Sequence, residues 1–321
     1  MVIRMAVAVE SNMHEHVART MYYFGIHMLY ASIVGCAALA LTSIRGGSAT
    51  AKYWIWVVTT LNFIVPTGAL IDQLWAPHLA WAAPLGLIGD AAWSLTQGRT
   101  AAMLALVWIV GTLAMLIRLA KRIRMARREA QYPVYLGKCG TMENFLAHGI
   151  PVNFDDRYQT PAVQGVLRPR ISLPSGLDHL LSHEELAAVL MHELAHARRR
   201  DNLISLLYEL GLCILWFHPL MWLAGARMSL YRELSCDESV IENAHGRELV
   251  SALAKLAAPE KGLFLQTGAS SHLSYRLGPL AGPPQLANRA ASMLMYILFV
   301  ALLSLGVFET VAHTACCFVL R

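Results

Sequence analysis

The most regular feature of the sequence is a series of long apolar stretches separated by polar segments. Three come early and one comes late, at about 20–41, 53–71, 101–120 and 291–312. Each is close to the roughly 20 residues that a helix needs to cross a lipid bilayer. The first follows a polar lead without a small-residue cleavage site, so we interpret it as a membrane span and not as a removable signal peptide. The pattern predicts a membrane region over 1–128 with three spans, and a last span with a short external tail over 291–321.

The segment between these regions, 129–290, has a different pattern. Short β-prone runs alternate with Gly and Pro over 132–173, which predicts a small, irregular antiparallel sheet. A helical pattern follows, opened by Ser182 with Glu185 three residues later, the signature of a capping box. We therefore expect a mostly α-helical integral membrane protein that carries an α+β domain over 129–290.

Composition and charge support this division and orient it. Hydrophobic residues make up 56% of the 321 residues and charged residues 15%, with a net charge of +5; soluble domains carry about 25% charged residues. An ordinary soluble protein is therefore not expected, and the small net charge gives no argument for direct nucleic-acid binding. Basic residues gather after the third span, at Arg118, Lys121, Arg122, Arg124, Arg127 and Arg128. The positive-inside rule places this side in the cytoplasm of a plasma-membrane protein, with both termini outside.

The strongest chemical signal is an HExxH motif inside the predicted helix. His192 and His196 are one turn apart on one face, so both imidazoles can reach one Zn²⁺ ion. Glu193 lies between them, where it can take a proton from a metal-bound water. The motif predicts a zinc metalloendopeptidase with one Zn²⁺ ion, in which Glu193 is the catalytic base.

A third protein ligand has to come from a downstream carboxylate. The candidates are Asp201, Glu209, Glu233, Glu238 and Glu242. Glu233 is favoured because Asp237 follows four residues later on the same helical face, where a second carboxylate can orient a zinc-binding histidine. The oxyanion-stabilising residue stays open, with Tyr208, Tyr231 and Arg232 as candidates by proximity in sequence.

Glu233 can reach the histidines only if the chain turns back between them. Residues 203–224 are nearly uncharged and long enough to cross a bilayer, which would separate His196 from Glu233 by roughly 30 Å. Pro219 disrupts a helix and pushes His218 out of the helical region, which predicts a hairpin bent there. The outgoing arm of this hairpin has about 14 residues (~21 Å as a helix) and the returning arm about 15 (~22 Å). These nearly equal lengths bring Glu233 back to the level of His196. The sequence leaves open whether this hairpin enters the bilayer.

These motifs resemble a known family, the BlaR/MecR-type antirepressor metallopeptidases, which are integral-membrane gluzincins. The matching pieces are RPRISLP, HELAHARRRDNL, WFHPLMW and RELSCDESV, in the family's order, over roughly 130–250. The resemblance implies a zinc site of His192, His196 and Glu233, with Glu193 as general base and Asp237 in support. The family's β-lactam sensors carry a penicillin-binding domain after the last span, and we expect this chain to lack it.

The resemblance implies that the substrate is a cytosolic transcriptional repressor, the protease itself, or both. Self-cleavage is hypothesised for the Pro/Gly-rich connector within 259–289, and a peptide substrate could add as a strand beside the sheet. The expected partners are this peptide or protein substrate and the lipid bilayer, and the sequence also allows a homodimer. Two alternatives stay open: a membrane quality-control or CAAX-type gluzincin of the HtpX sort, and a non-catalytic membrane receptor.

Overall fold

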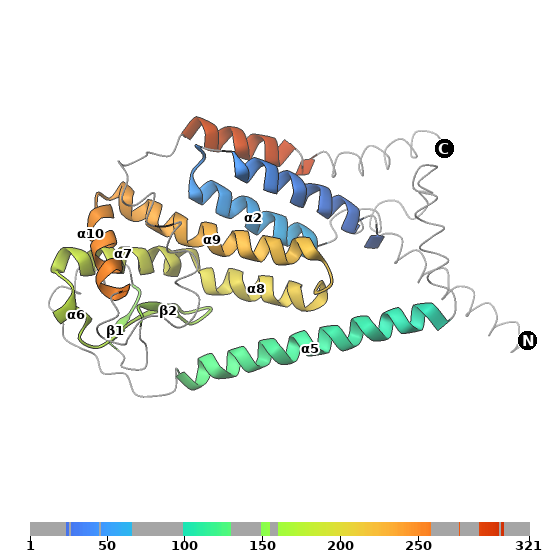
Figure 1. The fold of residues 1–321 in the computed structure, drawn as a ribbon, viewed down its shortest axis with the longest axis horizontal. Coiled ribbons are helices and arrows are strands. Elements are labelled where there is room, and N and C mark those ends of the chain that lie inside the picture. Colours follow the sequence, from blue (N-terminus) through green and yellow to red (C-terminus); the bar gives the residue numbers. More distant parts are fainter. Residues whose placement is uncertain are drawn as a thin grey trace, which may run out of the picture.

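The computed structural model describes residues 24–25, 27–44, 46–65, 99–129, 149–154, 160–257, 276, 289–301 and 303–304. The described chain is mostly helical, with one small sheet (Figure 1). Its helices form a bundle at one end, and the sheet lies with helices α6, α7 and α10 at the other end (Figure 1).

Two helices of the bundle come from the first two predicted spans. The helix His27–Ser43 runs in one direction and α2 (Ala49–Ile64) returns beside it. Ser48 begins α2 by accepting a hydrogen bond from the backbone N–H of Ala51 at 3.0 Å, as an N-cap residue does. Most side chains of α2 are buried against other helices, including Tyr53, Trp56 and Phe63. This helix therefore packs mainly against protein.

The third predicted span falls in α5 (Arg99–Glu129), which lies at the outer side of the bundle and contacts α8 (Figure 1). Its segment Met103–Met125 has a mean hydropathy of 2.2, and 6% of its apolar window is buried. Among the described residues this is the one helix long and apolar enough to cross a membrane.

The other predicted spans are described only in part. The helices His27–Ser43 and Arg289–Ala301 are apolar but shorter than a full span. Residues 20–23, 66–71 and 305–312, which complete the predicted spans, lie outside the described residues, as does the connector of the self-cleavage hypothesis apart from 276 and 289.

The small sheet has three strands in the order β1-β3-β2, formed by β1 (Val152–Phe154), β2 (Ala162–Gln164) and β3 (Arg170–Leu173). β2 and β3 are antiparallel, but β1 and β3 are parallel, so the expectation of an antiparallel sheet is wrong for this pair. The chain reverses twice between β1 and β3, which leaves them pointing the same way, and β3 then inserts between the other two strands. A sequence pattern predicts pairing between consecutive strands and does not reveal such an insertion.

Four helices build the part of the molecule beside the sheet. They are α6 (Leu177–Leu180), α7 (His183–Arg199), α10 (Gly246–Ala257) and the C-terminal half of α9 (Pro219–Glu242). The predicted capping box of α7 is confirmed, because the Ser182 hydroxyl accepts from the N–H of Glu185 and the Glu185 carboxylate accepts from the N–H of Ser182. Leu186, Val189, Leu190 and Leu194 of α7 enter the core between the sheet and α10.

The predicted helix break before Pro219 is also present. Four residues separate the end of helix α8 (Asp201–Ile214) from α9. Helix α9 starts with Pro219 as its first residue and runs back along α8 (Figure 1). This turn lies against α5: Trp108 donates to the Ile214 carbonyl at 2.9 Å, and a methyl group added at Gly111 would collide with the Trp216 ring. The hairpin therefore reaches the apolar part of α5.

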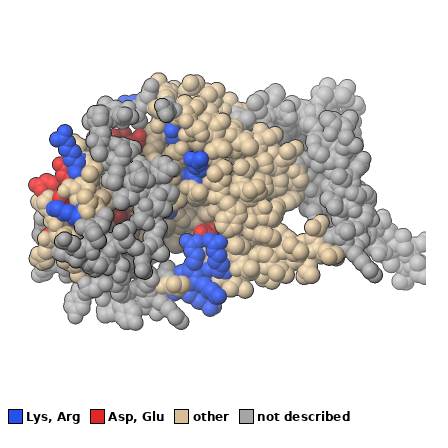
Figure 2. Space-filling view, in the orientation of Figure 1, with Lys and Arg blue, Asp and Glu red and all other residues tan. Residues whose placement is uncertain are grey.

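Charged and uncharged side chains occupy different parts of the molecular surface (Figure 2). On the face drawn in Figure 2, blue side chains gather at the lower edge, while uncharged residues cover the bundle beyond them. Toward the C-terminal end of α5, Arg122 pairs with Glu209 of α8. The Arg118 guanidinium lies 5.7 Å from the ring centroid of Trp222.

Candidate metal centre

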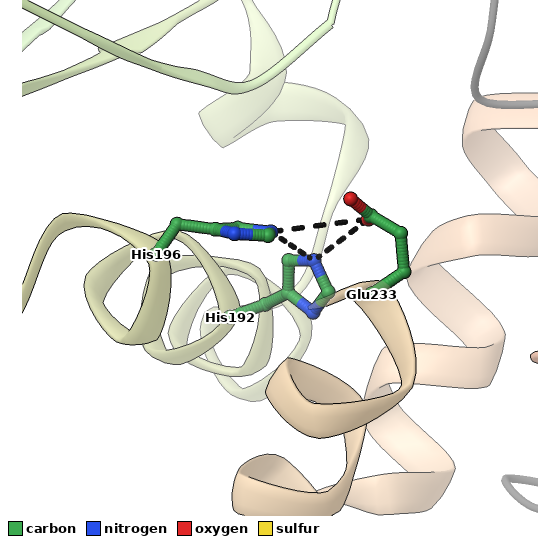
Figure 3. Close-up of side chains that lie close together, drawn as sticks. All are labelled: His192, His196 and Glu233. Carbon is green, nitrogen blue, oxygen red and sulfur yellow. Dashed lines mark hydrogen bonds and ion pairs between the residues drawn. The ribbon is translucent and has the colours of Figure 1, made fainter. Parts of the chain in front are cut away.

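Helix α7 places two imidazoles on one face. His192 and His196 are separated by one helical turn, and their Nε2 atoms lie 3.2 Å apart. The other face of α7 packs on the sheet and on α10, so the histidines face α9 (Figure 3). The capped helix thus presents both rings on the side that faces α9 (Figure 3).

The turn between α8 and α9 brings a carboxylate to the same point. Glu233 of α9 directs Oε2 to within 3.7 Å of His192 Nε2 and 3.8 Å of His196 Nε2 (Figure 3). Ligand atoms at the edges of a tetrahedral zinc site are about 3.4 Å apart, given Zn–N and Zn–O bonds of about 2.1 Å. The three atoms therefore fit one small cation, and a fourth direction is left for a water or a substrate.

A second carboxylate lies behind the first histidine. His192 Nδ1 is 3.0 Å from Asp237 Oδ1. Asp237 is buried and accepts two hydrogen bonds of 2.8 Å from Arg276, through Nε and Nη2. This His–Asp–Arg chain fixes the ring so that Nε2 faces the common centre.

The second histidine has a matching chain. His196 Nδ1 is 2.6 Å from Oδ2 of Asp201, the first residue of α8. Arg199 donates to both Asp201 oxygens, through Nε at 2.6 Å and Nη2 at 2.5 Å. Asp201 is buried, so its charge is balanced by the guanidinium and the imidazole and not by water.

These contacts set the protonation of the site. Burial by itself lowers the pKa of His192, but the carboxylates of Asp237 and Glu233 beside the ring outweigh burial and raise that pKa to about 9. Burial raises the pKa of the Glu233 carboxyl, yet the nearby imidazoles of His192 and His196 hold it well below its usual range. The pKa values of Asp201 and Asp237 are lowered too, because their arginine and histidine partners outweigh burial. The carboxylates are therefore ionised at neutral pH, as metal ligands and their supports must be.

The other residues predicted for the site occupy different positions in the fold. Glu193 is buried on α7 between the two histidines. Of the other ligand candidates, Glu209 pairs with Arg122, and Glu238 accepts from the first backbone N–H groups of α2. Glu242 is the last residue of α9.

The oxyanion candidates also differ in position. The Tyr231 hydroxyl donates to the backbone carbonyl of Thr42 and so points into the helix bundle. The Arg232 Nε lies 3.2 Å from Glu233 Oε1. Tyr208 packs within the apolar clusters of the bundle.

Sequence reasoning missed the two arginines of the site. Arg199 carried a local signal, because it precedes Asp201 by two residues at the end of the histidine helix. Arg276 carried none, since it lies 39 residues from Asp237 in the chain and only folding joins them.

The chain is similar to known proteins over the residues that form the bundle and the site. Residues 23–276 match the family described as BlaR1 peptidase M56. One relative, the methicillin resistance mecR1 protein of Staphylococcus aureus, is 24% identical over 147 residues, which are 44% of this chain and 25% of the relative. Another, the regulatory protein BlaR1 of Bacillus licheniformis, is 37% identical over 84 residues, 26% of this chain and 14% of the relative. The matched regions span a quarter or less of these relatives' own lengths.

Proposed function

Because this chain belongs to the BlaR1 peptidase M56 family, we propose that it is a membrane-embedded zinc endopeptidase of the antirepressor type. Its substrate in signal transduction is a cytosolic transcriptional repressor, the chain itself, or both. The observation that carries the proposal is the triangle of His192 Nε2, His196 Nε2 and Glu233 Oε2, with edges of 3.2, 3.7 and 3.8 Å. The family match favours this reading over the quality-control and CAAX-type alternatives.

In this proposal His192, His196 and Glu233 hold one Zn²⁺ ion, and Asp237 and Asp201 orient the two imidazoles. A bound zinc ion supplies Lewis acidity for the scissile carbonyl and lowers the pKa of water to about 7. The donor set of two imidazoles and one carboxylate is the type that catalytic zinc sites use.

Glu193 moves the proton in this scheme. Its carboxylate accepts a proton from the attacking water and delivers it to the leaving amine nitrogen as the peptide bond breaks. Glu193 is buried on the helix that carries both histidines, which limits the exchange of its protons with bulk water.

The sheet offers a place for the substrate backbone. β2 is an edge strand of the described sheet and packs against α7. Asn202 holds it there by donating to the carbonyls of Val163 and Gly165 at 2.9 and 3.0 Å. An extended peptide that adds at an edge of the sheet gains main-chain hydrogen bonds next to the histidine helix, although on β2 the carbonyls of Val163 and Gly165 already accept from Asn202.

We propose the following membrane arrangement. Residues 1–128 contain three spans, 129–290 form the protease domain on the cytosolic side, and 291–321 form a last span and an external tail. The turn between α8 and α9 contacts Trp108 and Gly111, well inside the apolar segment of α5. The hairpin therefore dips into the bilayer beside α5, and the metal site lies near the cytosolic surface.

A pair of variants tests the catalytic assignment. Glu193→Gln keeps all proposed metal ligands, so we expect it to bind one zinc ion and to lose about 10²- to 10⁴-fold in peptide hydrolysis. His196→Ala is expected to lose both metal and hydrolysis. The measurements are metal analysis of the purified protein and, where a small winged-helix repressor is encoded beside the chain, cleavage of that repressor.

Two results would contradict the proposal. Hydrolysis that persists in Glu193→Gln would exclude Glu193 as the base, and signalling unaffected by this change would favour the receptor alternative. Mass spectrometry that finds residues 259–289 intact in active protein would remove self-cleavage there and leave the repressor as the substrate.

A further inference from the structure

The first turns of α2 contact both helices that carry the metal ligands. One contact reaches the junction of α7 and α8, where His196 and Asp201 lie. A second contact reaches α9 at Ser235 and Glu238, two and five residues after Glu233. α2 also makes its most extensive packing contact with α9.

The contact toward His196 runs through Tyr53. Its buried hydroxyl donates to Asp201 Oδ1 at 2.9 Å, while Asp201 Oδ2 lies 2.6 Å from His196 Nδ1. The Arg199 guanidinium, which grips the same carboxylate, lies over the Tyr53 ring at 4.3 Å from its centroid. The ring and the hydroxyl of Tyr53 thus constrain both partners of the chain behind His196.

The contact toward Glu233 runs through Glu238 and Ser235 of α9. The Glu238 carboxylate accepts from the backbone N–H groups of Ala49 and Thr50 at 3.2 and 3.0 Å, at the positive end of α2. The Thr50 hydroxyl lies 2.8 Å from Ser235 Oγ, to which Arg199 also donates at 2.7 Å. Arg199 therefore connects the α2 contacts on the α8 side with those on the α9 side.

From this juxtaposition we propose that Tyr53 is a positioning residue for the metal ligand His196, and that the first turns of α2 hold the two ligand-bearing helices in register. The inference rests on the proposed zinc-peptidase function and adds a way to regulate it. A displacement of α2 in the membrane changes the geometry of the metal site through Asp201. None of the sequence motifs contains Tyr53.

The physical reason is the fixed orientation that an imidazole needs. The carboxylate that accepts from the outer ring nitrogen fixes the tautomer and the direction of the ring, and loss of such a partner costs about 10- to 100-fold in metal affinity or activity. Asp201 can rotate about its side-chain bonds unless its oxygens are held. Arg199 and Tyr53 hold them from two sides.

Cobalt(II) titration of the full-length protein tests the proposal, because the visible absorption of the bound ion reports ligand geometry independently of activity. We expect Tyr53→Phe, which keeps the ring over Arg199, to lower cobalt affinity about tenfold and to change the spectrum. Asp201→Asn should lower affinity at least as much. In the Asp201→Asn background, Tyr53→Phe should have no further effect, since both changes act through one carboxylate.

Tyr30→Phe is the matched control. Tyr30 also lies in a helix of the bundle and donates its hydroxyl at 3.2 Å, but to the carbonyl of Leu303. This variant should keep the wild-type affinity and spectrum. A wild-type cobalt spectrum in Tyr53→Phe, or an effect that adds fully to that of Asp201→Asn, would overturn the proposal.

If Tyr53→Phe does not fold, Thr50→Val tests the same turn from the α9 side. Thr50 is exposed, so the change is tolerated, and it removes the hydroxyl that contacts Ser235 and Glu238. We expect a cobalt affinity lowered about threefold and a changed spectrum, and an unchanged spectrum would again overturn the proposal. Failure of the zinc-peptidase function itself is distinguishable, because the wild-type protein would then bind no cobalt.

Discussion

Single residues decide how the two histidines are presented to a cation. Each Nδ1 atom faces a buried carboxylate, Asp237 for His192 and Asp201 for His196, and each carboxylate is gripped by an arginine through two hydrogen bonds. A carboxylate without its arginine would be an uncompensated buried charge, which costs several kcal/mol. The arginines therefore allow strong acceptors to stay ionised behind the metal ligands.

The raised pKa of His192 predicts a pH dependence of zinc binding. The metal-free protein holds a proton on His192 up to about pH 9, and the ion must displace it. Zinc affinity should therefore rise by up to about tenfold per pH unit as the pH increases toward about 9 and level off above it. By the same linkage, the stability that this proton gives the metal-free protein is fully present below pH 6.5 and is lost as the pH rises through about 9.

Competition titrations with a zinc chelator between pH 6 and 10 measure this dependence. Asp237→Asn is the control, because it removes the carboxylate that raises the pKa and should move the plateau to lower pH. Zinc affinity that is constant between pH 7 and pH 9 would show that His192 carries no proton to displace.

At the level of secondary-structure elements, Glu185 both caps the N-terminus of α7 and links this helix to α10. Glu185 completes the capping box with Ser182, and the same carboxylate accepts from Ser251 and Lys255 of α10 at 2.6 Å each. Burial raises the pKa of Glu185, but these donors outweigh it and lower the pKa to about 2. The N-terminus of the histidine helix is thus tied to α10.

We expect Glu185→Gln to destabilise the protein by about 1 kcal/mol at neutral pH, the usual cost of a lost helix cap. Because the folded-state pKa is depressed, the stabilisation is present above about pH 4.5 and is lost as the pH falls toward 2. The difference in unfolding free energy between wild type and variant should therefore shrink between pH 5 and pH 3. Denaturant unfolding of the detergent-solubilised protein measures it.

Glu184→Gln is the matched control for this prediction. Glu184 lies in the same first turn of α7 but is exposed, and it accepts from the Ser182 hydroxyl. It should change stability by less than Glu185→Gln. Equal stability of Glu185→Gln and wild type at pH 7 would mean that the link to α10 contributes nothing.

For the molecule as a whole, the proposed position of the α8–α9 hairpin in the bilayer is open to a direct test. Ile214 at the end of α8 is 48% exposed, and Leu167 in the turn between β2 and β3 is 69% exposed. If the hairpin lies in lipid, Ile214→Asp places a charge in the apolar layer, at a cost of about 2.5–3.5 kcal/mol. Leu167→Asp places the same charge in water and should cost almost nothing.

The measurement is the amount and thermal stability of each variant in isolated membranes. We expect Ile214→Asp to be depleted or destabilised and Leu167→Asp to match the wild-type protein. Two equally stable variants would mean that the turn at Ile214 faces water, and the hairpin would then lie outside the bilayer.

Local sequence determined the features that depend on neighbouring residues. The capping box of α7, the pair of histidines one turn apart and the helix break before Pro219 each follow from residues within a few positions of one another. The pairing of Glu233 with Asp237 could also be predicted, since a spacing of four residues places both on one face of a helix. These features are local because backbone geometry alone relates the residues.

Tertiary structure decided what depends on chain reversals and on contacts between distant segments. The parallel pairing of β1 with β3, the grip of Arg276 on Asp237 and the contact of Tyr53 with Asp201 join residues from 19 to 148 positions apart. Many partners are compatible with a given arginine or tyrosine in the sequence. Only packing selects one of them, because a buried charge or hydroxyl must find its partner among the groups that the fold brings near.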